Sequence, residues 1–182
     1  MLGQYKYTEK ERKEILKSMV ILVDTREQEN KHILEILDKK KISYKIKKLD
    51  YGDYSFYVPE NKELGIMRDT YFDNMIAIER KNSLEELSNN LTRERSAFEN
   101  EFIRAHNDNC KFIVMVEVGG LKEIAAHAYR TNLGEKAYFA SVLSFEQKYD
   151  AQFIWHMKDI AGKYIYERFG NFLSYHLRKG VE

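Results

Sequence analysis

The order of hydrophobic and polar residues divides the chain into short apolar runs and longer segments with helical spacing. Runs of strand length predict strands in MVILVD, YGDYSFYV, NMIAIERK, KFIVMVEVGG and QFIWHM, and SYKIKKLD alternates as a strand should. Helices are predicted at residues 8–17, 31–40, 83–88, 93–106, 121–127, 135–148 and 160–177, with a loop at 59–71. Strands alternating with helices indicate an α/β domain with a mixed central β-sheet flanked by helices.

Length and composition indicate one domain without a membrane segment. The chain has 182 residues, 43% of them hydrophobic, which is enough for a sizeable core. We expect residues 1–18 to form an N-terminal helical extension and residues 19–182 to form the main domain. No apolar run approaches the ~20 residues of a membrane helix, and the polar N-terminus does not look like a signal peptide. The single cysteine, Cys110, excludes an internal disulfide and a multi-cysteine zinc site, so we expect an intracellular protein.

Charged residues gather where predicted strands begin or end. Asp24 and Glu27 follow one strand, Asp53 lies in the turn before another, and a third strand ends with Glu79 and Lys81. Successive side chains of a strand alternate between its faces, so Glu79 and Lys81 share one face. A carboxylate and an ammonium on one face suit metal-assisted phosphodiester hydrolysis, in which a hard cation takes oxygen ligands and polarises the phosphate. Taken singly, each motif is also common as a helix cap, a turn or a surface ion pair.

Taken in order, these motifs resemble the XPF-type nucleases, a branch of the restriction-endonuclease-like superfamily. That family has a V-D-x-R-E strand, then G-D, then E-R-K followed after three residues by an acid. The matching residues here lie between positions 20 and 118 and are Asp24, Arg26, Glu27, Gly52, Asp53, Glu79, Arg80 and Lys81. The resemblance implies a restriction-endonuclease-like fold. It also implies a DNA endonuclease that uses Mg²⁺ or Mn²⁺ on branched, flap or fork DNA in replication, recombination or repair.

The same resemblance implies roles for individual residues. It implies that Asp53 and Glu79 are direct metal ligands, joined by the backbone carbonyl of Arg80. Lys81 then corresponds to the catalytic lysine, which orients or helps to deprotonate the attacking water or stabilises the transition state. Asp24 and Glu27 correspond to metal-site or supporting acids.

Three arginines are expected to contact DNA, namely Arg26, Arg93 and Arg95. Arg93 and Arg95 begin a predicted helix near the site, where they would add salt-dependent affinity without sequence information. Ion pairs with Glu94 and Glu99 are the competing interpretation of these two residues. The net charge of the whole chain, +1, does not by itself indicate a nucleic-acid-binding protein.

The chain departs from the family pattern at several points. The acid after E-R-K is Glu85 instead of the usual Asp, Ala97 replaces the usual Gln, and no helix-hairpin-helix motif is recognisable. Two other functions therefore stay open, a non-catalytic nuclease-fold subunit that binds DNA or an active protomer, and a linear-DNA nuclease of the same superfamily. The presence of the acids and the lysine argues against the first, and the E-R-K triplet argues against the second.

Partners and location follow from the resemblance. XPF-type domains usually pair through the nuclease domain, so we expect a homodimer or a heterodimer bound to DNA, with no membrane association. The compact form resembles versions found in bacteria and their phages. We therefore expect a cytoplasmic protein of a bacterium or a phage-infected cell, associated with DNA.

Overall fold

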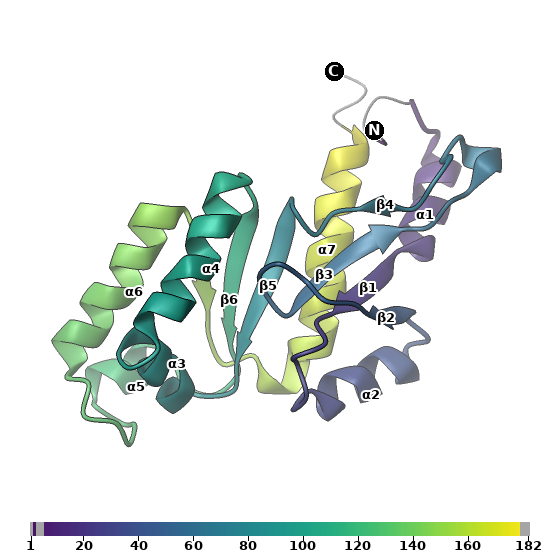
Figure 1. Ribbon diagram of the computed structural model, residues 1–182. Helices are drawn as coiled ribbons and strands as arrows, with labels where there is room; N and C mark the ends of the chain where they lie inside the picture. The colour runs from purple at the N-terminus through teal and green to yellow at the C-terminus, as the bar shows by residue number, and fades with distance from the viewer. Residues whose placement is uncertain (1, 3–5, 179–182) are drawn as a thin grey trace. The chain divides into compact units, whose positions relative to one another are not determined.

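The chain folds into two compact units, each with its own strands and helices (Figure 1). The computed structural model describes residues 2 and 6–178 of the chain. The first unit comprises residues 1–48, 54–73 and 162–182, and the second unit comprises residues 49–53 and 74–161. Each unit is therefore assembled from segments that lie far apart in the sequence.

The first unit contains a small mixed sheet with the strand order β2-β1-β3-β4. Its strands are β1 (Val20–Val23), β2 (Tyr44–Ile46), β3 (Tyr54–Val58) and β4 (Thr70–Tyr71). Strand β1 runs parallel to β2 and antiparallel to β3, with Ile21 opposite both Tyr44 and Phe56. The last three residues of β1 are fully buried, as expected of a strand that is covered on both faces.

Helices complete the first unit. They are α1 (Glu9–Ser18), α2 (Lys31–Lys39), the 3₁₀ turn η2 (Lys62–Leu64) and α7 (Ala161–Arg178). Thr8 begins α1 with a capping box, in which its side chain and that of Glu11 each accept a hydrogen bond from the other's backbone N–H. Helix α7 buries a stripe at a spacing of four residues, and its Phe169 ring lies 5.3 Å from that of Phe56 on β3.

The second unit is a parallel α/β arrangement with the strand order β5-β6-β7. Its strands are β5 (Ile76–Lys81), β6 (Lys111–Val116) and β7 (Gln152–Ile154). Its helices are α3 (Leu84–Leu91), α4 (Arg95–Asn107), α5 (Leu121–Ala125), α6 (Glu135–Tyr149) and the 3₁₀ turn η3 (Lys158–Ile160). Helices α3, α4 and α6 pack against these strands.

An aromatic cluster joins the helices of the second unit to its strands. The Phe102 ring of α4 lies 4.8 Å from Phe112 of β6 and 4.6 Å from Phe145 of α6, in edge-to-face geometry. Ala77 of β5 belongs to the same buried core. Strand β5 is therefore packed against a close-packed layer of side chains.

The predicted fold class is confirmed, because the structure has an α/β fold with both parallel and antiparallel strand pairs. The predicted strands and helices are present, with ends that differ by a few residues. The segment 59–71 differs from the prediction of a loop, since it contains η2 and β4. Strand β4, which pairs with β3, is only two residues long. Two residues are too few to show the alternation of apolar and polar positions that predicts a strand. Within the described residues, no helix is long and apolar enough to cross a membrane.

Candidate active site

The carboxyl end of β5 carries a buried acid–lysine pair. The Lys81 Nζ lies 2.6 Å from Glu79 Oε1, and both side chains are only 8% exposed. Strand alternation explains the pair, because residues two apart on a strand project from one face. Glu79 lies opposite Val114 and Lys81 opposite Val116 on β6. Both β6 residues belong to the core under the helices, so the pair faces this helical layer.

Asp53 joins this end of β5 through backbone hydrogen bonds. The backbone N–H of Arg80 donates to Asp53 Oδ2 at 2.8 Å, and the Asp53 N–H donates to the Ile78 carbonyl at 2.9 Å. The preceding Gly52 has φ +70°, and a Cβ at this position would lie 3.1 Å from the Cβ of Ala77. The turn thus needs glycine both for its conformation and for its close approach to β5.

The charges around Lys81 favour its ammonium form. Burial alone would lower the pKa of Lys81, but the nearby charges of Glu79 and Asp53 and the hydrogen bond to Glu79 outweigh it. The pKa of Lys81 is therefore raised above its usual value. Glu86 adds a third carboxylate with Oε1 3.7 Å from Lys81 Nζ, and the ammonium also lies 4.9 Å from the Phe98 ring centre.

Arg80 has a different role from its two neighbours in the triplet. Its guanidinium forms a buried ion pair with Glu117, with Nε 2.9 Å from Oε1 and Nη2 2.9 Å from Oε2. The Nη2 contact is a charge-assisted hydrogen bond, a stronger kind than a bond between neutral groups. Glu117 follows β6 directly, and its N–H donates to the Lys81 carbonyl at 2.8 Å. The Arg80 backbone lies between Glu79 and Lys81, so its carbonyl belongs to the same strand end as the acid–lysine pair.

Asp24, Arg26 and Glu27 form a separate local arrangement in the first unit, at the end of β1. Asp24 is 1% exposed, and its Oδ1 accepts from the backbone N–H of Arg26 at 2.8 Å and from Arg26 Nε at 2.7 Å. The Glu27 N–H donates to the Asp24 carbonyl at 3.2 Å. Asp53, Glu79 and Lys81 belong to the second unit.

The two arginines near α3 and α4 lie in different surroundings. Arg93 is exposed in the turn between these helices. Arg95 packs against α6, because its guanidinium lies 5.2 Å from the Phe145 ring centre and its Nη1 donates to the Ser141 hydroxyl at 3.4 Å. Its Nε also lies 3.9 Å from Glu99 Oε2, which is one of the ion pairs of the competing interpretation.

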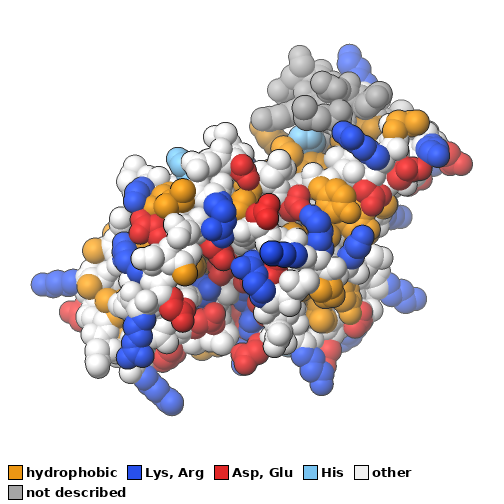
Figure 2. All heavy atoms as spheres, in the orientation of Figure 1, with side chains coloured by type: hydrophobic (Ala, Val, Ile, Leu, Met, Phe, Trp, Pro, Cys, Tyr) orange, Lys and Arg blue, Asp and Glu red, His pale blue; other side chains and the backbone are white. Residues whose placement is uncertain are grey.

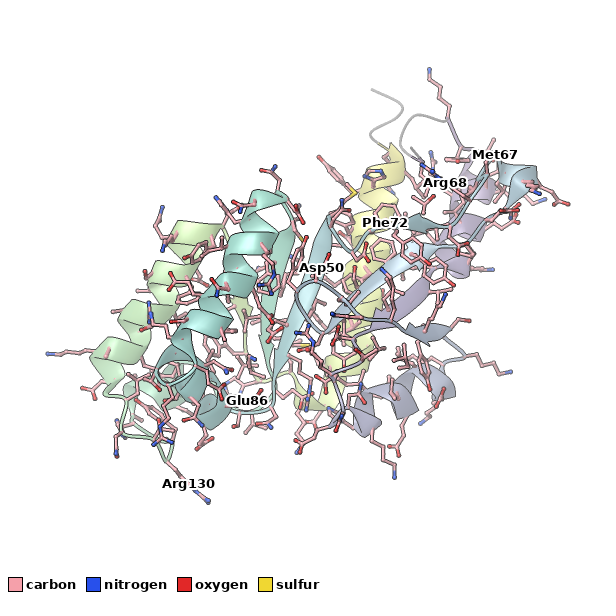
Figure 3. The ribbon with its side chains drawn as sticks, viewed as in Figure 1. Asp50, Met67, Arg68, Phe72, Glu86 and Arg130 are labelled. Atoms are coloured by element: carbon pink, nitrogen blue, oxygen red, sulfur yellow. The ribbon has the colours of Figure 1, made fainter. Side chains whose placement is uncertain are left out.

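Glu85 points to the loop before α6, and its Oε1 accepts from the backbone N–H of Arg130 at 3.1 Å. Burial would raise the pKa of Glu85, but the backbone hydrogen bonds, including the one from Arg130, lower it overall. Glu86, which follows it, is instead the acid near Lys81, and Figure 3 labels it near the start of α3.

Sequence reasoning missed Glu86 and Glu117. Glu86 had a visible signal, because Ser83 and Glu86 have the spacing of a helix cap, and the Ser83 hydroxyl accepts from the Glu86 N–H. That signal indicates a helix start and no more. The Glu86 carboxylate also accepts from the Asn82 N–H at 2.8 Å, which orients it near Lys81. Glu117 carries no sequence signal for its partner, which lies on another strand.

The acid–lysine cluster fits a divalent cation such as Mg²⁺. Asp53, Glu79 and Glu86 lie around one ammonium, so the cluster formally holds more negative than positive charge. Within the described part of the chain, no three acidic, histidine or cysteine side chains form a ready-made metal cage. Mg²⁺ is commonly held by one or two carboxylates, while water and substrate phosphates supply the remaining ligands. The side chains of Asp53 and Glu79 meet that requirement.

The fold and the cluster together define the class of a restriction-endonuclease-like α/β protein. A model of the ERCC4 domain matches residues 23–162. The chain therefore belongs to the ERCC4 domain family, which confirms the resemblance to XPF-type nucleases.

Two solved structures share this fold. XPF from Aeropyrum pernix matches 82% of this chain and 59% of its own, with 18% identity and a TM-score of 0.58. XPF from Aeropyrum pernix in complex with DNA matches 84% of this chain and 64% of its own, with 19% identity and a TM-score of 0.59. This chain thus spans less than two thirds of either structure. No curated protein matches its sequence.

Proposed function

We propose that the chain is a metal-dependent DNA endonuclease that acts on branched, flap or fork DNA in replication, recombination or repair. The observation that carries the proposal is the meeting of Asp53, Glu79 and Lys81 at the end of β5. Membership of the ERCC4 domain family and the fold shared with an XPF bound to DNA support it. The proposal places the protein with DNA inside the cell.

In this proposal the side chains of Asp53 and Glu79, with the Arg80 carbonyl, hold Mg²⁺ or Mn²⁺. When bound, such an ion polarises the phosphate and lowers the pKa of a bound water. The Lys81 ammonium orients the attacking water or stabilises charge that develops on the phosphate oxygens. Asp53 is half-buried and Glu86 is partly exposed, so these two acids are the solvent-accessible members of the cluster.

Loss of either proposed ligand tests the activity. We expect Asp53→Asn and Glu79→Gln to reduce cleavage of a labelled fork duplex in Mg²⁺ by ~10³-fold or more, because several kcal/mol of transition-state stabilisation are lost. DNA binding measured in chelator should change little. Asp159→Asn removes an exposed acid outside the cluster and is the matched control. Full activity in either ligand variant would contradict the proposal. Cleavage of a panel of single-strand, duplex, flap, fork and four-way DNA by the wild-type chain identifies the preferred substrate.

Metal binding has its own readout without DNA. A ligand that binds only the folded state raises the unfolding midpoint. We expect Mg²⁺ to raise the midpoint of the wild-type chain and to have a much smaller effect on Glu79→Gln. Equal midpoint shifts in the two proteins would place the ion elsewhere.

The proposal includes pairing of two subunits through this domain. Leu143 of α6, an apolar side chain with 57% exposure, is a position at which this pairing can be tested. We expect Leu143→Glu to lower the dimer fraction in sedimentation equilibrium. A chain that is monomeric at every concentration would contradict a homodimer and leave only pairing with a different subunit.

A further inference from the structure

A polar groove lies beside α3 in the second unit. It has a volume of about 540 Å³ and lies between the C-terminal end of α3 and the segment before α6. Its lining is Ser88, Asn89, Thr92, Arg93, Arg130, Thr131, Asn132, Leu133 and Gly134. Leu133 is the single large apolar residue of this lining, so the groove suits a polar ligand.

Two arginines give the groove a positive charge. Arg93 and Arg130 are both exposed, and within the described residues neither guanidinium forms an ion pair with a carboxylate. No acid is among the lining residues. The nearby Glu85 accepts a hydrogen bond from the Arg130 backbone and also interacts electrostatically with the Arg130 guanidinium, and the Arg130 side chain extends outward from the loop, as Figure 3 shows. Figure 2 shows basic side chains projecting at this end of the unit, below α3 and α5. Arg93 and Arg130 thus differ from Arg95, which is held in the helix packing.

Hydroxyl groups hold the two walls of the groove together. The hydroxyls of Ser88 on α3 and Thr131 on the loop lie 2.6 Å apart. The Thr92 hydroxyl donates to the Ser88 carbonyl at 2.7 Å, which fixes the end of α3. The amides of Asn89 and Asn132 are exposed beside these hydroxyls. Arginine together with neutral hydroxyl and amide donors is the usual set of contacts to phosphate oxygens in protein–DNA interfaces.

The distance between the groove and the active site can be estimated from α3. Glu86 in the first turn of α3 lies near Lys81, whereas Ser88, Asn89 and Thr92 at its other end line the groove. A helix of eight residues is ~12 Å long. One strand of duplex DNA places a phosphate every ~3.4 Å along the axis, so the groove lies within about three or four phosphates of the cluster.

We infer that this groove binds the phosphodiester backbone of the DNA substrate within three or four nucleotides of the cleaved bond. Arg93 and Arg130 make the charged contacts, and the exposed amides of Asn89 and Asn132 add neutral ones. The inference rests on the proposed function, because it takes the cluster at β5 as the site of cleavage. The groove contacts position the DNA without reading its sequence.

The test measures binding of a fluorescent fork duplex in chelator, at several salt concentrations, for Arg93→Gln, Arg130→Gln and the double variant. Each lost phosphate contact should reduce the slope of log K against log salt by ~0.9, which corresponds to about eightfold weaker binding at 0.1 M salt. The double variant should lose about twice that slope. Lys111→Gln is the control, since it removes an exposed charge at the opposite end of β6 and should change affinity less than twofold.

The outcomes separate this inference from the proposed function. If the wild-type chain binds DNA and both arginine variants match Lys111→Gln in affinity and slope, the groove is not a backbone site, while the endonuclease proposal stands. If the wild-type chain does not bind DNA at all, both proposals are overturned. The variants should keep the wild-type unfolding midpoint, which confirms that weaker binding does not come from unfolding.

Discussion

The ion pair between Arg80 and Glu117 predicts a distinctive pattern of stability changes. Both side chains are nearly buried, at 7% and 2% exposure, and they meet through two contacts of 2.9 Å. Removal of one partner of a buried ion pair leaves the other charge without that pair, which destabilises a fold by about 3–5 kcal/mol. A domain of this size loses ~2–4 °C of unfolding midpoint per kcal/mol. Arg80→Met and Glu117→Leu should therefore each lower the midpoint by about 6–20 °C.

The double variant separates the cost of a lone charge from the value of the pair. Replacement of a buried ion pair by apolar residues of similar volume is often neutral or stabilising. We therefore expect Arg80→Met/Glu117→Leu to be more stable than either single variant. If the two residues were independent, the double variant would instead lose the sum of the stability lost in the two single variants. The assay is thermal unfolding followed by circular dichroism, with urea unfolding as a second measurement.

An exposed ion pair provides the control. Lys13 and Glu9 are 2.7 Å apart, closer than Arg80 and Glu117, but their side chains are 69% and 75% exposed. Because water screens this pair, Lys13→Met should leave the midpoint nearly unchanged. The reasoning fails if Arg80→Met destabilises the chain no more than Lys13→Met, or if the double variant is as unstable as the sum of the single variants.

Three further predictions concern the backbone, a helix cap and pH. Gly52→Ala and Gly65→Ala both force alanine into a left-handed conformation, at ~1–2 kcal/mol. Only Gly52 is crowded, so Gly52→Ala should lower the free energy of urea unfolding more than Gly65→Ala and should also reduce cleavage. Equal losses of stability in the two variants would contradict the close approach to β5. Thr8→Ala should destabilise by ~1 kcal/mol through loss of the α1 cap, measured by thermal unfolding, whereas Thr8→Ser should not. Hydrogen bonds from Lys148 and from a tyrosine hydroxyl lower the pKa of Glu99. This acid therefore contributes stability above the unfolded-state pKa of ~4.3, and the contribution is lost as pH falls through the lower folded-state pKa. The free energy of unfolding should fall less steeply with decreasing acidic pH in Glu99→Gln than in the wild type, and an unchanged slope would contradict the assignment.

Local periodicity predicted much of the fold and one part of the site. Alternation along a strand places Glu79 and Lys81 on one face, and the structure shows their side chains 2.6 Å apart. The helix and strand patterns likewise predicted the order of elements and the α/β class. These features depend on residues that are neighbours in the sequence, so a pattern of period two or 3.6 is enough to reveal them.

Contacts between distant segments could not be derived from such patterns. Asp53 meets β5 only because its turn hydrogen-bonds to Ile78 and Arg80, which lie more than twenty residues further along the chain. The resemblance to a family suggested that meeting, whereas periodicity did not.

The different surroundings of similar residues were also decided by packing between elements. The Arg80 side chain faces Glu117 at the end of a neighbouring strand, and Arg95 packs on a ring of α6, while Arg93 stays exposed beside the groove. A sequence pattern shows which face of its own helix or strand a side chain occupies. The partner on that face depends on strand register and helix packing, which exist only once the chain has folded.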